Sequence, residues 1–367
     1  MSSLATHTET FRAPGRVNLI GEYTDFNDGF VLPMAIDRYT YVSAELGSGS
    51  TVTAWSENLE KSVTILSPRE GELLPTGPSD WAAALRGVIA ILRRRGLAKR
   101  GARLLIRSQI PLRGGLSSSA SFEVACAYAL LAMNGESLPG PELAKVAWQA
   151  ENEYAGLKCG IMDQFIVANA PPGAALLLDC RSLESWPVPL PAAVEVVVLN
   201  TMVKRELAAS AYNTRRAECD EAARLMGVKS LRDADPAKLV GLPEPVRSRA
   251  KHVIEENARV MAFMEALPRG DWAKVRELMA GSHAGLRDEF EVSCPELDFM
   301  ADKGVELGSL GSRMTGGGFG GCTVHFVKAG WSEAFLRDLS AAYKERYGID
   351  AQGFICHPGN AVEEVRP

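Results

Sequence analysis

Ile110-Pro-Leu-Arg-Gly-Gly-Leu-Ser-Ser-Ser-Ala-Ser121 joins a predicted strand, 104–112, to a predicted helix, 120–133. Its two glycines allow the backbone to approach a ligand closely, and its three consecutive serines place hydroxyls and free amides at the start of the helix. Such a helix N-terminus attracts phosphate because its N–H groups are unpaired and its dipole end is positive. A hydroxyl there can also bind Mg²⁺. The segment predicts a phosphate-binding loop; the alternative is that the serines only cap the helix.

A second glycine-rich segment, Met314–Gly321, contains a formal GxGxxG pattern. In a dinucleotide-binding fold this pattern follows a strand and opens a helix, whereas here a predicted strand, 322–327, comes after it. We therefore reject a dinucleotide fold, and the absence of GxxxxGK[ST] argues against a P-loop NTPase. The segment is either a flexible turn or, as five glycines in six residues favour, a backbone surface that lies against a ligand.

Predicted strands and helices follow one another in mixed order, which indicates an α+β fold and not a doubly wound parallel sheet. The expected strands are 51–57, 61–67, 104–112, 174–179, 194–200, 322–327 and 353–356. The expected helices are 80–96, 120–133, 142–155, 206–226, 246–267, 272–286 and 332–347. Three prolines in Trp186–Pro191 cannot continue a helix or a central strand. We therefore expect two domains, 1–190 and 191–367.

The composition is that of a globular protein with 46% hydrophobic and 23% charged residues. A net charge of -5 supplies no cationic excess for nucleic acid. The polar N-terminus does not resemble a signal peptide, and no apolar run is long enough to cross a bilayer. Seven scattered cysteines without a CxxC pair favour reduced thiols over disulfides or zinc. We expect a cytoplasmic protein that is a monomer or a weak homo-oligomer and binds neither nucleic acid nor membrane.

Several acids stand in sequence contexts that suggest chemistry. Glu22 and Asp25 follow Arg16 within Gly15–Gly29, and their spacing suits paired hydroxyls of a polyol as well as it suits solvated turn acids. Asp163 lies alone in an apolar segment, so it is either functional or a structural partner for a cation such as Arg16. Glu151, on a predicted helix, is an ordinary surface residue or a metal ligand.

Four blocks together resemble the galactokinases, a branch of the galacto-, homoserine, mevalonate and phosphomevalonate kinases. They are Gly15–Asp37, Pro111–Ser121, Cys159–Gln164 with Asp179–Glu184, and Ser312–Val324. The glycine-serine loop alone marks only the larger family, whereas the first and third blocks point to the branch. The resemblance implies a two-domain α+β kinase fold with ATP and sugar in the cleft between the domains.

The resemblance also implies roles for individual residues in the phosphorylation of the C1 hydroxyl of galactose. Asp163 matches the catalytic base and Arg16 the cation that stabilises the transition state. The residues that match sugar contacts are Glu22, Tyr23, Thr24, Asp25, Gly160, Asp163 and Tyr212. The residues that match ATP contacts are Trp81, near the adenine, and Arg113, Gly114, Gly115, Leu116, Ser117, Ser118 and Ser119. Ser119 and Glu151 match the ligands of Mg²⁺.

Three residues depart from the family pattern. Tyr23 replaces a histidine that contacts the C6 hydroxyl of the sugar, Arg113 replaces a small residue, and Ala84 replaces a frequent tyrosine. Tyr23 leaves open a kinase for N-acetylgalactosamine, arabinose or galacturonate. A non-catalytic galactose sensor is a further alternative, but such relatives have a damaged glycine-serine loop and this loop has no deletion.

Overall fold

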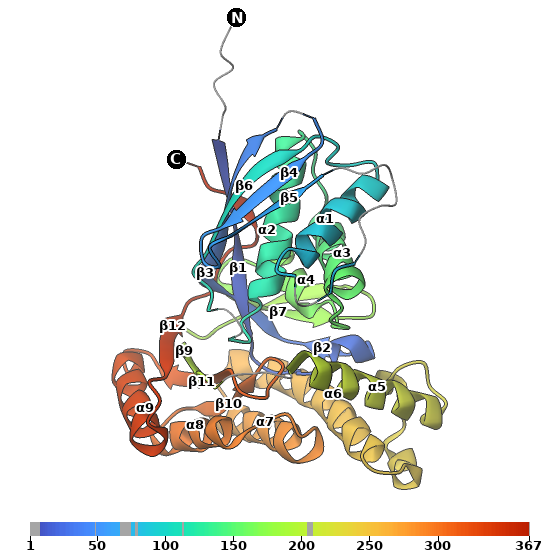
Figure 1. The fold of residues 1–367 in the computed structure, drawn as a ribbon. Coiled ribbons are helices and arrows are strands. Elements are labelled where there is room, and N and C mark those ends of the chain that lie inside the picture. The colour runs from blue at the N-terminus through green and yellow to red at the C-terminus, as the bar shows by residue number, and fades with distance from the viewer. Residues whose placement is uncertain are drawn as a thin grey trace, which may run out of the picture.

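The computed structural model describes residues 8–47, 49–66, 75–77, 80–111, 114–203 and 208–366. Two bodies lie one above the other, the first built mainly of blue and green elements and the second mainly of yellow to red ones (Figure 1). Strand β1, Thr8–Asn18, begins in the upper body and ends near the lower one. The C-terminal segment returns to the upper body, where β13, Glu363–Glu364, pairs with β1.

The upper body contains a sheet in the order β13-β1-β3-β6-β4-β5. Its remaining strands are β3 Pro33–Leu46, β6 Ala102–Ser108, β4 Val52–Ser56 and β5 Lys61–Ile65. The helices that pack with it are α1 Ala83–Arg94, α2 Ser118–Met133, α3 Gly140–Ala150 and α4 Met162–Asn169. Helix α2 contacts the sheet and the other three helices. This central position explains why small and apolar residues occupy most of its faces.

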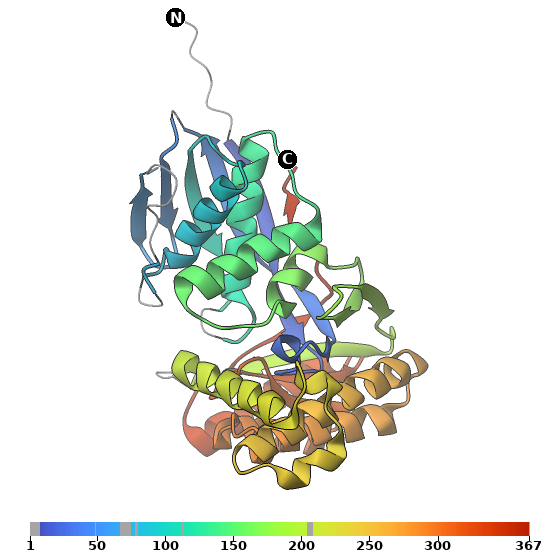
Figure 2. The same ribbon diagram turned by 90° about the vertical axis from the view of Figure 1, so that its right-hand side faces the viewer.

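The lower body contains an antiparallel sheet in the order β10-β11-β9-β12. Its strands are β9 Val194–Asn200, β10 Gly311–Thr315, β11 Cys322–Lys328 and β12 Gln352–Cys356. Its helices are α5 Ala208–Met226, α6 Val246–Arg269, α7 Trp272–Ala284, α8 Pro295–Glu306 and α9 Ser332–Tyr347. Figure 2 shows these helices stacked below the upper body.

A small third sheet lies between the two larger ones in the order β2-β7-β8. Strand β2, Phe30–Val31, pairs with β7, Ala174–Asp179, and β7 pairs with β8, Ser185–Pro189. The proline-rich segment at 186–191 is thus mostly an edge strand, a sheet position that tolerates proline. A continuous buried cluster joins Val17 of β1 to Val196 and Phe326 of the lower sheet.

The expectation of an α+β fold is confirmed, because among the described strands every pairing except β4–β6 is antiparallel. The strands 174–179 and 194–200 and the helix 332–347 have the bounds that the sequence predicts. The strand expected at 104–112 ends at Ser108, where its pairing with β3 stops, and Ile110 is buried in the loop that follows. The helix expected at 142–155 becomes a π turn at Glu151.

Candidate active site

Arg16 and Asp163 form the centre of the site. Arg16 lies on β1 and Asp163 in the first turn of α4. The Arg16 Nε donates to Asp163 Oδ1 at 2.8 Å, and its Nη2 donates to Oδ2 at 3.0 Å. The Arg16 side chain is 5% exposed and that of Asp163 30%, so the carboxylate retains an open side. The ion pair between Arg16 and Asp163 that we considered from the sequence is present in the structure.

The same arginine connects this acid to the glycine-serine loop. Its Nη1 donates to the carbonyl of Gly115 at 2.6 Å, and its backbone N–H donates to the carbonyl of Leu116 at 3.1 Å. A Cβ at Gly15 would lie 2.9 Å from that Leu116 oxygen, so glycine allows the loop to rest on β1. Two segments about a hundred residues apart are therefore held together by the side chain and the backbone of one residue.

The glycine-serine loop leads directly into α2. Ser117 precedes the helix in the left-handed region, with φ of +59°. Within the described residues its hydroxyl makes no capping hydrogen bond and has no partner, although it is buried. The capping alternative is therefore not realised by Ser117. Ser118 is half-buried and Ser119 is exposed, whereas Arg113 lies outside the described residues.

Ser119 contacts two buried acids, Glu123 and Glu151, near the start of α2. Its hydroxyl donates to Glu151 Oε1 at 2.8 Å and lies 3.5 Å from Glu123 Oε1. The Gln164 amide donates to both acids, to Glu151 Oε2 at 2.6 Å and to Glu123 Oε2 at 3.2 Å. Burial raises the pKa of both carboxyls, and the rise is increased for Glu123 by Glu151 and for Glu151 by Asp163. A positive charge at this point would be favourable.

Asp25 packs directly against the backbone of Gly160. A Cβ at Gly160 would lie 2.1 Å from Asp25 Oδ2, so a larger residue cannot occupy this position without displacing the acid. Burial raises the pKa of Asp25 to about 6, and the negative charge of Asp163 adds to the rise. Burial also raises the pKa of Tyr212, and the charge of Asp25 adds to that rise. These four residues thus converge from three segments of the chain.

The other residues of the Glu22–Asp25 segment are engaged within the protein. Glu22 is 2% exposed and forms an ion pair with Arg313, and its Oε1 accepts from the Gly316 N–H at 3.0 Å. Thr24 is fully buried, and its hydroxyl donates to the carbonyls of Gly21 and Phe30. The contacts of Glu22 and Thr24 within the protein therefore stabilise the conformation of this segment.

Tyr23 lies in a cluster of aromatic rings. Its ring centroid is 4.4 Å from that of Phe290, 5.2 Å from that of Tyr212 and 6.1 Å from that of Phe26. It is 4% exposed, and its hydroxyl donates to the carbonyl of Gly317 at 2.6 Å. Tyr23 therefore connects the segment to the second glycine-rich loop.

That second loop joins the antiparallel strands β10 and β11, which confirms that it is not a dinucleotide-binding turn. Its glycines are required by close contacts. A Cβ at Gly316 would lie 2.8 Å from the carbonyl of Gly115, and one at Gly318 only 2.1 Å from the carbonyl of Val292. Both glycines also have positive φ. The two glycine-rich loops thus meet beside Arg16.

Sequence comparisons extend over almost the whole chain. Residues 5–46 match the galactokinase galactose-binding signature, and residues 75–170 and 263–345 match the N-terminal and C-terminal domains of the GHMP kinases. The galactokinase of Roseiflexus sp. (strain RS-1) is 44% identical, with 96% of this chain and 92% of the relative covered. That of Thermococcus kodakarensis is 41% identical, with 95% and 98% covered. The chain belongs to the galactokinase family.

Solved structures agree with this placement in the galactokinase family. Lactococcus lactis galactokinase complexed with galactose is 33% identical and gives a TM-score of 0.91, with 98% of this chain and 95% of the other covered. The mevalonate kinase of Methanococcus jannaschii, at 19% identity and a TM-score of 0.68, shares the fold. The predicted two-domain α+β kinase fold is confirmed, and membership of the family makes the chain an enzyme of the kinase class.

The sequence analysis did not predict two charged residues of the site, Glu123 and Arg313. Glu123 follows Ser119 by one helical turn in a run of small and apolar residues, a position that could have marked it as buried. Arg313 is fully buried directly before the second glycine-rich loop. Trp81, predicted near the adenine, is half-buried with its ring 6.4 Å from that of Phe122.

The part of the galactokinase-family chain that the structure describes contains no cluster of three or more His, Cys, Asp or Glu side chains arranged to hold a metal ion. No helix within the described ranges is both long and apolar enough to span a membrane. None of the seven cysteines, all of which lie in the described ranges, forms a disulfide bond.

Proposed function

We propose that this protein transfers the γ-phosphate of ATP to the C1 hydroxyl of α-D-galactose and produces galactose 1-phosphate and ADP. One observation carries the proposal: Arg16 joins the Asp163 carboxylate to the Gly115 carbonyl of the glycine-serine loop. An acid and a cation thus lie beside a helix start whose amides suit phosphate. Phosphoryl transfer requires this combination of positioning and charge neutralisation.

The sugar lies, in this proposal, against Asp25, Gly160 and Tyr212. Asp25 and Tyr212 are the predicted sugar contacts on which Asp163 acts electrostatically. Glu22, Tyr23 and Thr24 support this surface through Arg313, Gly317 and backbone carbonyls. A carboxylate that faces a sugar accepts hydrogen bonds from its hydroxyls, which fixes the orientation of the ring.

Replacing Gly160 with alanine is expected to raise the KM for galactose by about ten-fold or more, because the new methyl group displaces the Asp25 carboxylate. The KM for ATP should stay within about two-fold of the original value, because Gly160 has no part in the glycine-serine loop. Steady-state kinetics with each substrate varied in turn measures both. Gly241→Ala provides a control for alanine at a glycine, since nothing lies within 4 Å of a Cβ there and its φ is not in the left-handed region. An unchanged KM for galactose contradicts the contact.

Asp163 is the proposed acceptor of the hydrogen of the C1 hydroxyl. As that oxygen bonds to the γ-phosphorus, the bond from this phosphorus to the β-phosphate oxygen breaks and ADP leaves. Asp163 either takes the proton as a general base or only orients the hydroxyl, which then loses its proton late in the transfer. Arg16 stabilises the negative charge that develops on the transferred group. In this proposal the backbone N–H groups of loop residues 114–119 donate hydrogen bonds to the phosphates of ATP. Trp81 lies near the adenine.

Mg²⁺ is proposed to bind at Ser119 and Glu151. The observed donors, a hydroxyl and a carboxylate 2.8 Å apart, are hard oxygen ligands of the kind that Mg²⁺ prefers. Burial raises the pKa of Glu151 and of the neighbouring Glu123, so the group accommodates positive charge. When bound, the ion neutralises charge on the phosphates of ATP.

The remaining expectations concern partners and location. The proposed partners are a small sugar and ATP, with no nucleic acid or membrane, in a monomer or a weak homo-oligomer. We place the protein in the cytoplasm, where ATP is available and where thiols such as its seven cysteines remain reduced.

The test is to incubate the purified protein with galactose, ATP and Mg²⁺ and to analyse the product by ³¹P and ¹H NMR. Coupling of the phosphorus to the anomeric proton is the expected result. Phosphate on C6, or no ADP release, contradicts the proposal. A parallel panel of N-acetylgalactosamine, arabinose and galacturonate tests the related-sugar alternative, which the engagement of Tyr23 with Gly317 keeps open.

A further inference from the structure

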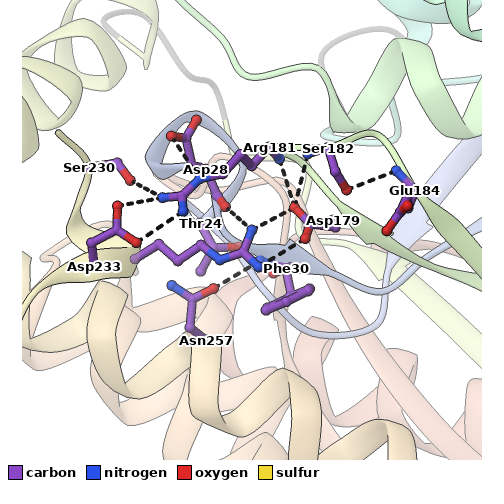
Figure 3. Close-up of polar contacts among 11 residues, drawn as sticks. Thr24, Asp28, Phe30, Asp179, Arg181, Ser182, Glu184, Ser230, Asp233 and Asn257 are labelled. Atoms are coloured by element: carbon purple, nitrogen blue, oxygen red, sulfur yellow. Dashed lines mark hydrogen bonds and ion pairs between the residues drawn. The ribbon is translucent and has the colours of Figure 1, made fainter.

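Asp179, at the end of β7, is the centre of a polar cluster whose labelled members include no residue of the glycine-serine loop (Figure 3). Its Oδ1 accepts from the backbone N–H groups of Arg181 at 2.9 Å and Ser182 at 3.2 Å. Arg232 donates to both carboxylate oxygens, to Oδ1 at 2.6 Å and to Oδ2 at 2.9 Å. This two-pronged geometry is the form of arginine–carboxylate contact with the most defined orientation.

Arg232 also contacts the residues that follow the turn bearing Asp25. Its Nη1 donates to the carbonyl of Asp28 at 2.9 Å, and its guanidinium lies 4.2 Å over the ring of Phe30. Asp28 follows the 3₁₀ turn Asp25–Asn27 directly, so the turn that carries Asp25 ends at the residue that Arg232 binds. From α6, Asn257 Oδ1 accepts from the Phe30 N–H at 2.9 Å.

A second arginine extends the cluster to the segment that follows α5. Arg181 contacts Asp28 Oδ2 at 3.3 Å and donates to Asp233 Oδ2 at 2.6 Å and to Ser230 Oγ at 2.9 Å. Helix α5 carries Tyr212, and the segment 230–233 comes after it in the chain. The turn that bears Asp25 is therefore tied to the segment that follows the helix bearing Tyr212.

We propose that Arg232, through its pairing with Asp179 and its contacts with Asp28 and Phe30, is a positioning residue that fixes Asp25 for sugar binding. The inference rests on the proposed function. The half-buried pair is the part of the cluster that carries this role: Arg232 is 21% and Asp179 12% exposed at the side chain. The Arg181–Asp233 pair is more open, with 40% and 44% exposed, and contributes less.

Arg232→Lys is the first variant, because lysine keeps the charge but cannot reproduce the two-pronged contact or the stacking on Phe30. We expect the KM for galactose to rise about five- to ten-fold, with kcat and the KM for ATP within about two-fold of wild type. Arg224→Lys, in an exposed pair with Glu221 on α5, is the matched control and should change none of the three. Unchanged KM for galactose in Arg232→Lys, or equal rises in both KM values, overturns the proposal.

A double variant separates positioning from stability. Asp179→Asn with Arg232→Gln removes both charges and leaves no buried acid without a partner. We expect it to be closer to wild type in thermal unfolding than Arg232→Gln alone, while the KM for galactose stays raised. Recovery of KM together with thermal stability would mean a purely structural role.

Hydrogen exchange of the backbone amides of residues 24–31 provides a readout that needs no substrate. We expect about ten-fold faster exchange in Arg232→Lys than in wild type and no change in Arg224→Lys. If the wild type fails to phosphorylate galactose, the proposed function fails, and exchange alone decides whether Arg232 fixes this segment. Exchange at the wild-type rate overturns the proposal.

Discussion

Asp163→Asn is expected to lower kcat by at least about 100-fold, within the range that proton transfer by a positioned side chain contributes. Asparagine keeps the size of the side chain and one oxygen that can accept from Arg16, but it cannot take a proton. The affinity for ATP should remain near normal, because the glycine-serine loop is held to Arg16 through the Gly115 carbonyl and not through Asp163. A coupled assay for ADP release and calorimetric titration with ATP measure the two quantities.

The same variant distinguishes the two roles left open for this acid. If Asp163 only orients the C1 hydroxyl, the amide still accepts its hydrogen bond and activity stays above about a hundredth of the wild-type value. Such a result would count against the general base. Glu153→Gln is a matched control, because Glu153 is an exposed acid of the nearby π turn that pairs with Arg94. Its kcat should not change.

The parts of the site that the sequence predicted are those that short motifs encode. A strand, a glycine-serine turn and a helix of small residues define the phosphate loop locally, because backbone geometry over a dozen residues determines where its amides point. The strand that carries Arg16 was missed, since β1 contains Pro14 and Gly15 and changes register with β3 between them. The strand pattern is interrupted at the place where the loop rests on it.

Contacts between distant segments could not be predicted in the same way. Glu22 and Arg313 are 291 residues apart, and no periodicity in either segment indicates a partner in the other. Glu22 was predicted as a sugar contact by resemblance, yet its carboxylate also accepts from Arg313, Thr315 and Gly316. The hydroxyl of Tyr23 likewise contacts Gly317, a relation that depends on how the two glycine-rich loops pack. Short motifs identified these residues but not their neighbours.

The ion pair of Arg313 with Glu22 leads to the second large expected effect. Arg313 is completely buried, and its Nη1 also donates to the carbonyl of Leu19 at 3.0 Å. Arg313→Met leaves the buried Glu22 carboxylate without its cation, which costs about 3–5 kcal/mol. We expect the midpoint of thermal unfolding at pH 8 to fall by about 5 °C or more. Arg337→Met, in an exposed pair with Asp338, should lower it by less than about 1 °C.

The loss in Arg313→Met should depend on pH in a defined direction. Burial raises the pKa of Glu22 above 4.5, and Arg313 opposes the rise, so the variant raises this pKa further. An acid whose folded pKa is raised favours the folded state when it is protonated, and this contribution is lost as the pH rises through the folded pKa. The difference from wild type should therefore be greatest at pH 8 and shrink as the pH falls through the raised pKa of Glu22. Adding Glu22→Gln to Arg313→Met should restore part of the stability at pH 8, because the unpaired charge is gone. Thermal unfolding of both variants and the wild type at each pH measures this difference in stability. The same loss of stability at every pH in both variants would show that lost packing, not the buried charge, destabilises Arg313→Met.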